Sequence, residues 1–259
     1  MSIYASRPIL LYCCFVAAIL GGAMGSFLHC AAWRMVRGES FVRGRSRCPA
    51  CGHVLGPAEL IPLLSWPLLR GKCRWCGTAI PVRYEIAECF FACVSVACLL
   101  RFDLSAACLR NYVFLCCLFC LSLTDWESMI IPDGTLLTAA GAWLLCAPFL
   151  GWKEALGGVA AGVLCGGGIL VLSLVMDRVL GRESMGGGDI KLFTVAGLYL
   201  GPVGTLFAVL LACVLGLLPA LMAGRGRTFP FGPSIAAAVG IMLFCGEWLT
   251  AWYLGLAGL

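Results

Sequence analysis

Residues 190–223 read IKLFTVAGLYLGPVGTLFAVLLACVLGLLPALMA, and this apolar run decides how the chain folds. A helix needs about 20 mostly apolar residues to cross the roughly 30 Å of hydrocarbon in a lipid bilayer. The run is too long for one ordinary transmembrane helix and short for two, and its only internal break is Gly201-Pro202. It therefore predicts either one long helix or two helices that meet at this break.

The composition places the whole chain in a membrane. Of the 259 residues, 61% are hydrophobic and only 12% are charged, which is too little polar surface to cover a soluble globular protein. This excludes a water-soluble enzyme, a disordered tail and a nucleic-acid-binding module. We expect an all-α polytopic membrane protein with about eight transmembrane helices. The expected helices cover residues 8–32, 85–101, 105–124, 130–150, 154–176, 190–200, 203–223 and 231–258.

The distribution of Lys and Arg favours two helices in the run at 190–223. We take the long loop after the first helix as cytoplasmic, because it is rich in arginine. With eight helices, all of the 18 Lys and Arg residues then lie on the cytoplasmic side except Arg7, Arg101, Arg110 and Lys153. A single helix at 190–223 would move Arg225 and Arg227 to the opposite side. Both termini are therefore expected outside the cytoplasm.

The only sizeable aqueous segment, residues 33–84, contains two C-x2-C pairs. Cys48 and Cys51 form the first pair, Cys73 and Cys76 form the second, and a glycine directly follows each pair. A two-residue spacer lets both thiolates face one tetrahedral ion, and the glycine allows the tight turn. Four thiolates in a reducing compartment favour a structural zinc site over disulfides. A redox dithiol is the main alternative.

Most of the remaining cysteines lie inside apolar runs, where they act as small hydrophobic residues. Cys117 and Cys120 repeat the C-x2-C spacing within the helix expected at 105–124, and they are expected to serve packing alone. His53 lies two residues after Cys51 and could replace a ligand. Because four thiolates are already available, we expect His53 to be a surface residue.

Two aspartates at the membrane edge are the candidates for catalysis, since ionisable groups in or beside transmembrane helices are costly. Asp125 is expected at the cytoplasmic end of the third helix, and Asp189 follows Gly186-Gly187-Gly188 at the start of the sixth. Two carboxylates within a few Å share a proton, so one can serve as general base and the other as general acid for peptide hydrolysis. The glycines would let an extended substrate backbone approach Asp189.

The carboxylates also have interpretations without catalysis. Asp125 and Asp189 could cap helices, pair with nearby cations such as Arg178, Arg182 or Lys191, or belong to an ion or proton pathway. Asp133 is expected to be the N-cap of the helix at 130–150. Lys191 could bind an anionic group or reach the headgroups. Glu85 and Glu88 are expected to favour the helix dipole or face a polar crevice, and Glu247 is given no role.

Taken together, these motifs resemble those of bacterial type IV prepilin peptidases, which are membrane aspartic endopeptidases of the GxGD type. The resemblance covers nearly the whole chain, from Gly25-Ser26-Phe27-Leu28 through both cysteine pairs and Asp125 to the segment 186–192. One departure is His29, which stands where the family usually has asparagine. The resemblance implies eight transmembrane helices, a catalytic pair and a Zn²⁺ site. The implied catalytic residues are Asp125 and Asp189, and the implied zinc ligands are Cys48, Cys51, Cys73 and Cys76.

The same resemblance implies the substrate and a second activity. Members of the family remove the short basic leader of prepilins or pseudopilins after a glycine, on the cytoplasmic side of the bacterial inner membrane. Many then methylate the new N-terminus with S-adenosylmethionine, and the cysteine-bearing loop suggests that this chain has both activities. The sequence assigns no residue to S-adenosylmethionine. An imidazole can replace the hydrogen bond of an amide, so the change at His29 is expected to adjust the activity without abolishing cleavage. It puts any role of that position in methyl transfer in doubt.

The expected organisation has three parts: a first transmembrane helix in residues 1–32, the zinc-binding loop in residues 33–84 and the aspartic peptidase domain in residues 85–259. The expected partners are a prepilin or pseudopilin and the lipid bilayer, with no nucleic acid. Two other classes stay open. One is a scaffold component of a pilus or secretion assembly, and the other is a transporter, which would carry paired acids near the bilayer midplane on broken helices.

Overall fold

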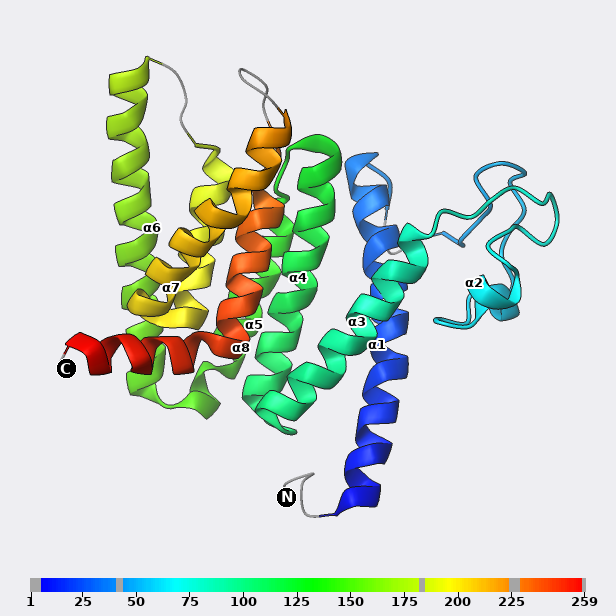
Figure 1. Ribbon diagram of the computed structural model, residues 1–259, viewed down its shortest axis with the longest axis horizontal. Helices are drawn as coiled ribbons and strands as arrows, with labels where there is room; N and C mark the ends of the chain where they lie inside the picture. Colours follow the sequence, from blue (N-terminus) through cyan, green and yellow to red (C-terminus); the bar gives the residue numbers. More distant parts are fainter. Residues whose placement is uncertain (1–5, 41–43, 182–184, 224–228, 258–259) are drawn as a thin grey trace. The chain divides into compact units, whose positions relative to one another are not determined.

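The computed structural model describes residues 6–40, 44–181, 185–223 and 229–257 (Figure 1). It divides into two compact units, residues 1–108 and 109–259, which are described separately. Four cations used in the charge argument lie outside the described residues: Arg43, Arg182, Arg225 and Arg227.

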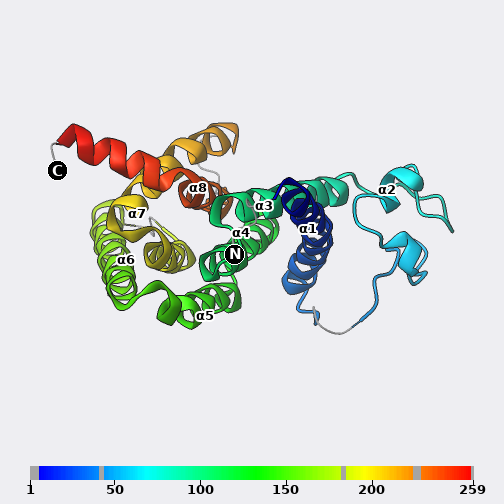
Figure 2. The ribbon, with the colours of Figure 1, turned by 90° about the horizontal axis from the view of Figure 1, so that it is seen from below.

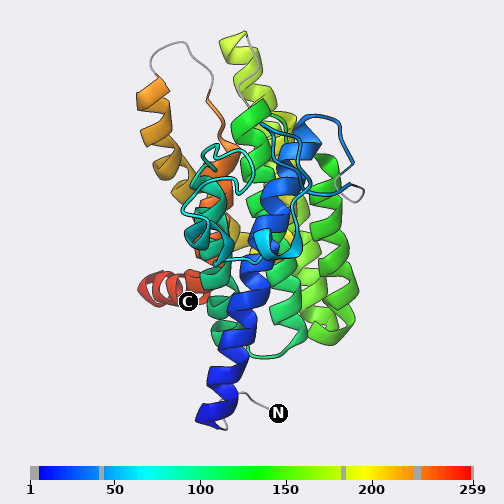
Figure 3. The ribbon, with the colours of Figure 1, turned by 90° about the vertical axis from the view of Figure 1, so that its right-hand side faces the viewer.

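The first unit is a pair of long helices joined by the cysteine-bearing loop (Figure 3). Small residues on one face of the first helix let the two helices approach closely. A Cβ atom at Gly25 would lie 2.5 Å from the carbonyl oxygen of Ala87, and one at Gly21 would lie 2.5 Å from that of Phe91. The elements are α1 (Arg7–Val36), the 3-10 helix η2 (Pro57–Glu59), the short α2 (Ser65–Leu68) and α3 (Arg83–Phe102).

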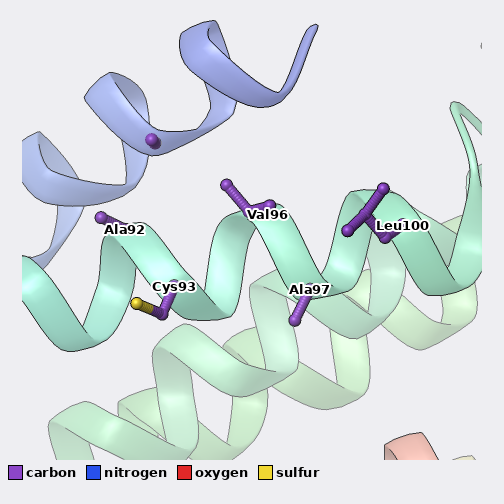
Figure 4. Close-up of a pocket in the computed structure, with 6 residues that line it drawn as sticks. Ala92, Cys93, Val96, Ala97 and Leu100 are labelled. Atoms are coloured by element: carbon purple, nitrogen blue, oxygen red, sulfur yellow. The ribbon is translucent and has the colours of Figure 1, made fainter. Parts of the chain in front are cut away.

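An apolar groove of about 360 Å³ runs between α1 and α3 (Figure 4). Its lining contains no charged side chain, and its only titratable group is the thiol of Cys93. The lining residues are Ala18, Ala92, Cys93, Val96, Ala97 and Leu100.

The second unit is a bundle built around α7 (Figure 2). Glycines on α6 allow close contact with α7, because a Cβ atom at Gly158 would lie 2.7 Å from the carbonyl oxygen of Leu198. Gly166 packs against Thr194 in the same way, as expected for a glycine inside a transmembrane helix. The helices are α4 (Ala106–Ser128), which begins in the first unit, α5 (Asp133–Leu150), α6 (Trp152–Leu180), α7 (Gly187–Ala223) and α8 (Gly232–Ala257).

The break at Gly201 divides α7 into two helices. Gly201 has φ 70° and ψ 178°, a left-handed conformation that glycine adopts most easily, and Pro202 follows it. Both ends of α7 lie at one end of the unit. Gly188, near the first end, packs against Ile131, which follows α4, and Gly216, near the second end, packs against Phe231, which precedes α8. The predicted split is therefore confirmed, and the chain doubles back at Gly201.

The described residues thus contain seven long helices, one of them broken in two, which agrees with the eight expected from the sequence. Judged by length and composition, five of the seven can cross a membrane: α1, α4, α6, α7 and α8. The other two, α3 and α5, are shorter, and α3 carries charged residues near both ends. The protein is a multi-pass membrane protein.

Candidate functional site

Each cysteine pair forms a tight turn. In the first pair, the backbone N–H of Gly52 donates to the carbonyl oxygen of Cys48 at 2.9 Å, and the N–H of Cys48 donates to that of His53 at 2.9 Å. Gly52 has φ +72°, so a residue with a side chain would be strained here. A β-bridge between Arg47 and Val54 closes the turn.

The second pair repeats this geometry. The N–H of Gly77 donates to the carbonyl oxygen of Cys73 at 2.9 Å, and the N–H of Cys73 donates to that of Thr78 at 2.8 Å. Gly77 has φ +69°, and a bridge between Lys72 and Ala79 closes the turn. The glycines predicted from the sequence are therefore required by the backbone conformation.

The two turns bring four sulfur atoms together at the spacing of a metal site. The ligand atoms of Cys48, Cys51, Cys73 and Cys76 all lie within 4.8 Å of one another. The Sγ atoms of Cys48 and Cys76 are 3.8 Å apart. Tetrahedral Zn²⁺ with Zn–S bonds of about 2.3 Å requires sulfur atoms about 3.8 Å apart. The four cysteines therefore form a cluster that can hold a metal ion.

Local hydrogen bonds favour the thiolate form, which is the form that binds metal, at Cys48 and Cys76, whereas loss of solvent and the neighbouring thiols Cys48 and Cys76 raise the pKa of Cys51 to about 11. The hydroxyl group of Thr78, together with its backbone amide, lowers the pKa of Cys76 to about 6. The backbone amides of Cys51 and Ala50 lower the pKa of Cys48. His53 is not part of the cluster, and its ring packs at a tilt against that of Trp75, with centroids 4.2 Å apart.

The loop is attached to the helix pair through Glu88, a contact that sequence reasoning missed. Glu88 lies on α3 with 7% of its surface exposed, and its Oε2 accepts a hydrogen bond from the backbone N–H of Leu63 at 2.8 Å. Leu63 has φ +66° and also packs against Gly22 on α1. Glu88 therefore holds a strained point of the loop against both helices.

His29, the residue that departs from the family pattern, lies in the same unit. Only 6% of its surface is exposed, and its ring packs on that of Tyr84, with centroids 4.4 Å apart. His29 therefore connects α1 to the first turn of α3.

The second unit brings both candidate aspartates to one end of its bundle. Asp125 lies in the last turn of α4 with 6% of its surface exposed, and its Oδ2 accepts a hydrogen bond from the backbone N–H of Gly232 at 2.8 Å. Asp189 lies half-buried in the first turn of α7. The two carboxylates are near enough for the charge on Asp125 to act on Asp189. Helix ends far apart in sequence thus place both aspartates at the same end of the bundle.

The glycines before Asp189 have different surroundings. A Cβ atom at Gly188 would lie 3.0 Å from the Cβ of Ile131, so this glycine serves packing between the start of α7 and the segment before α5. A Cβ atom at Gly187 would meet no atom within 4 Å. Gly187 therefore leaves the open space that was expected of all three glycines.

Lys191 and Asp133 form an ion pair, with Nζ and Oδ1 2.7 Å apart and side chains that are 58% and 65% exposed. The prediction that Asp133 is an N-cap is wrong, because Pro132 occupies the N-cap position and Asp133 is the first residue of α5. Lys191, which was expected to bind an anionic group or to reach the headgroups, contacts the carboxylate of Asp133. No local sequence pattern predicts this pair, because its two residues lie in different helices.

The fold and these sites define a class: a polytopic membrane protein with a tetracysteine loop and an aspartate pair where helices α4 and α7 meet. Two family models match the parts of the chain that carry these two sites. The bacterial peptidase A24 N-terminal domain matches residues 19–102, and the type IV leader peptidase family matches residues 112–221. No solved structure matches the chain at a significant level.

Curated relatives extend the match to most of the chain. The prepilin leader peptidase/N-methyltransferase of Bacillus subtilis is 34% identical over 249 residues, which is 92% of this chain and 97% of the relative. The Myxococcus xanthus protein of the same name is 37% identical, covering 80% of this chain and 63% of the relative. The type 4 prepilin-like proteins leader peptide-processing enzyme of Escherichia coli is 32% identical, with 85% and 90% covered. This chain belongs to the type IV leader peptidase family.

Proposed function

We propose that this protein is a membrane aspartic endopeptidase that removes the leader of type IV prepilins or pseudopilins and then methylates the new N-terminus. The names and coverage of its relatives support both activities. The peptidase assignment is supported best by the position of Asp125 in the last turn of α4 and of Asp189 in the first turn of α7, at one end of the second unit.

In the proposed mechanism, the aspartates share one proton. The ionised carboxylate takes a proton from a water molecule, whose oxygen adds to the carbonyl carbon of the scissile peptide bond. The protonated carboxyl group donates a hydrogen bond to the developing oxyanion. The C–N bond then breaks, and a carboxyl group delivers its proton to the leaving amine.

The surroundings of Asp189 also leave room for a peptide substrate. The open space at Gly187, two residues before Asp189, admits an extended peptide backbone beside the carboxylate. We propose that the aspartates face the cytoplasm and that both termini lie in the periplasm, because this orientation keeps most cations on the cytoplasmic side. The basic leader of the substrate would then be cut at the cytoplasmic face.

We further propose that Cys48, Cys51, Cys73 and Cys76 bind one structural Zn²⁺ ion. The sulfur spacing and the hydrogen bonds to the thiolates support this ligand set. Zinc would hold the two turns together, which fits a loop with little regular secondary structure of its own. S-adenosylmethionine would supply the methyl group. The proposed organisation keeps the first helix, the zinc loop and the peptidase domain as three parts, at residues 1–32, 33–84 and 85–259.

Single substitutions test the peptidase assignment. Asp125→Asn and Asp189→Asn are each compared with the natural protein in proteoliposomes that contain a prepilin, and the product is analysed by mass spectrometry. Glu127→Gln is the matched control, because Glu127 is an exposed carboxylate two residues from Asp125. We expect both aspartate variants to insert normally and to lose leader removal, while the control cleaves normally. Normal processing by both variants would favour the scaffold or transporter alternatives.

A further inference from the structure

The first residue of α8 contacts the Asp125 carboxylate directly. The backbone N–H of Gly232 donates a hydrogen bond to Oδ2 of Asp125 at 2.8 Å, and both residues are buried. The contact joins residues 107 positions apart in the sequence. It is therefore a tertiary contact that forms only when α4 and α8 have packed.

Glycine is required at this position by space. A Cβ atom at residue 232 would lie 2.7 Å from Oδ2 of Asp125 and 3.0 Å from its Cγ. The φ angle of Gly232 lies outside the left-handed region, so its backbone conformation alone would accept other residues. Any side chain at this position would displace the carboxylate.

The position of this amide is itself fixed by packing. Phe231 lies against Gly216 in the second half of α7, where a Cβ atom would be 2.6 Å from Cε2 of the ring. The backbone N–H groups of Ser234 and Ile235 donate to the carbonyl oxygen of Phe231 at 3.0 and 3.1 Å. The residue before Gly232 is therefore held by the packing of its ring against α7 and by the first turn of α8, which fixes the position of the Gly232 amide.

This arrangement suits a carboxylate. The first N–H groups of a helix have no acceptor within the helix, and the helix dipole places partial positive charge at the same end. The amide of Gly232 is such a group, and Asp125 supplies its acceptor from another helix. One carboxylate oxygen is engaged in this way, which fixes the rotation of the carboxyl group.

We propose that Gly232 is a positioning residue for peptide hydrolysis: its amide holds Oδ2 of Asp125, and its missing side chain leaves room for the carboxylate. The other oxygen of Asp125 is then presented to the attacking water and to Asp189. This inference rests on the proposed peptidase function.

The first test compares Gly232→Ala with Gly240→Ala. Gly240 lies on the same helix, and a Cβ atom there would make an ordinary contact with Leu115 at 3.8 Å. With a purified prepilin in proteoliposomes, we expect kcat of Gly232→Ala to fall roughly 100-fold, because small displacements of a catalytic group have effects of this size. KM should change by less than about threefold, since substrate binding is untouched. Gly240→Ala should retain both values within about threefold.

The second test removes the hydrogen-bond donor without adding a side chain. Cell-free synthesis into nanodiscs, with glycolate incorporated at position 232, replaces the amide N–H by an ester oxygen. We expect kcat to fall at least about tenfold, with KM unchanged, because hydrogen bonds to charged groups have effects of this order. If Gly232→Ala fails to fold, the ester variant alone tests whether the Gly232 amide positions Asp125.

The outcomes separate the two proposals. If the ester form, or a folded Gly232→Ala, keeps the natural kcat while Asp125→Asn is inactive, the positioning role is overturned and the peptidase assignment stands. A rise in KM at constant kcat would also overturn it, since that result means weaker substrate binding. If Asp125→Asn and Asp189→Asn both cleave normally, the peptidase assignment fails and the positioning role fails with it.

Discussion

The cysteine cluster of the first unit and the aspartate pair of the second are assembled in opposite ways. The cluster is built from two short turns, each fixed by its own backbone hydrogen bonds and by one glycine with positive φ. The aspartate pair depends on the packing of α4, α7 and α8, which includes the hydrogen bond between Asp125 and Gly232, 107 residues apart in the sequence. A site built from local turns can be recognised from residue spacing, whereas a site built from helix ends depends on the packing of the whole bundle.

The largest expected effect tests whether the two sites are independent. Asp189→Asn should lower the rate of leader cleavage by at least about 1,000-fold, because a carboxamide cannot exchange the catalytic proton. Its zinc content should stay at that of the natural protein, since the cluster is formed by residues of the loop alone. Cleavage kinetics and metal analysis of one preparation measure both quantities. Loss of zinc in this variant would contradict the separation of the two sites.

Removal of a buried cysteine of the cluster, a proposed zinc ligand, should act mainly on stability. We expect Cys73→Ser to abolish stoichiometric zinc binding and to lower Tm by roughly 5–10 °C, because a structural metal contributes directly to folding. Cleavage should fall less than in the aspartate variants. Cys213→Ser, which changes an exposed cysteine on α7, is the control and should keep zinc and Tm. Less than one zinc per chain in the natural protein, with free thiols, would contradict the assigned metal site.

A smaller effect is expected where the loop meets the helices. Glu88→Ala removes the acceptor for the strained residue Leu63, so the loop should be cut by trypsin about 10 times faster, a change set by the cost of the lost hydrogen bond. Glu88→Gln keeps an acceptor oxygen and should stay within about threefold of the natural protein. Equal protection of the loop in Glu88→Ala would show that the cysteine cluster alone orders it.

The smallest effect is expected at the ion pair beside Asp189. Lys191→Met and Asp133→Asn should each lower kcat/KM by no more than about fivefold, because an exposed ion pair is weakened by solvent and salt. The double variant should be no worse than either single variant if the pair acts as a unit. Raising the ionic strength should reduce the effect of each substitution. Additive losses would mean that Lys191 has a separate role, such as binding an anionic group.

The sequence predicted those features that depend on composition or on local spacing. The apolar run with its Gly-Pro break predicted both halves of α7, because only glycine easily adopts the conformation of Gly201. The spacing of the cysteines predicted the cluster down to Gly52 and Gly77. The sequence could not predict the contact of Leu63 with Glu88 or the pair of Lys191 with Asp133. These contacts depend on how separate segments pack, and the residues themselves have no distinctive local pattern.

Gly232 was missed for a related reason. A glycine before a proline at the start of a helix has a sufficient local explanation, and nothing in its neighbourhood refers to Asp125. The structure shows that the missing side chain is required by a carboxylate from another helix. Likewise, three adjacent glycines before Asp189 suggested one common purpose, but their surroundings separate Gly188, which packs, from Gly187, which faces open space.

The reversal at Gly201 has a consequence for how the protein enters the membrane. The segment 187–200 rises only about 20 Å as a helix, which is shorter than the hydrocarbon layer it has to enter. A segment of this length is too short to span the hydrocarbon by itself, so we expect it to enter the membrane together with residues 203–223, as a hairpin. We therefore expect the placement of Asp189 to depend on a segment that is synthesised after it.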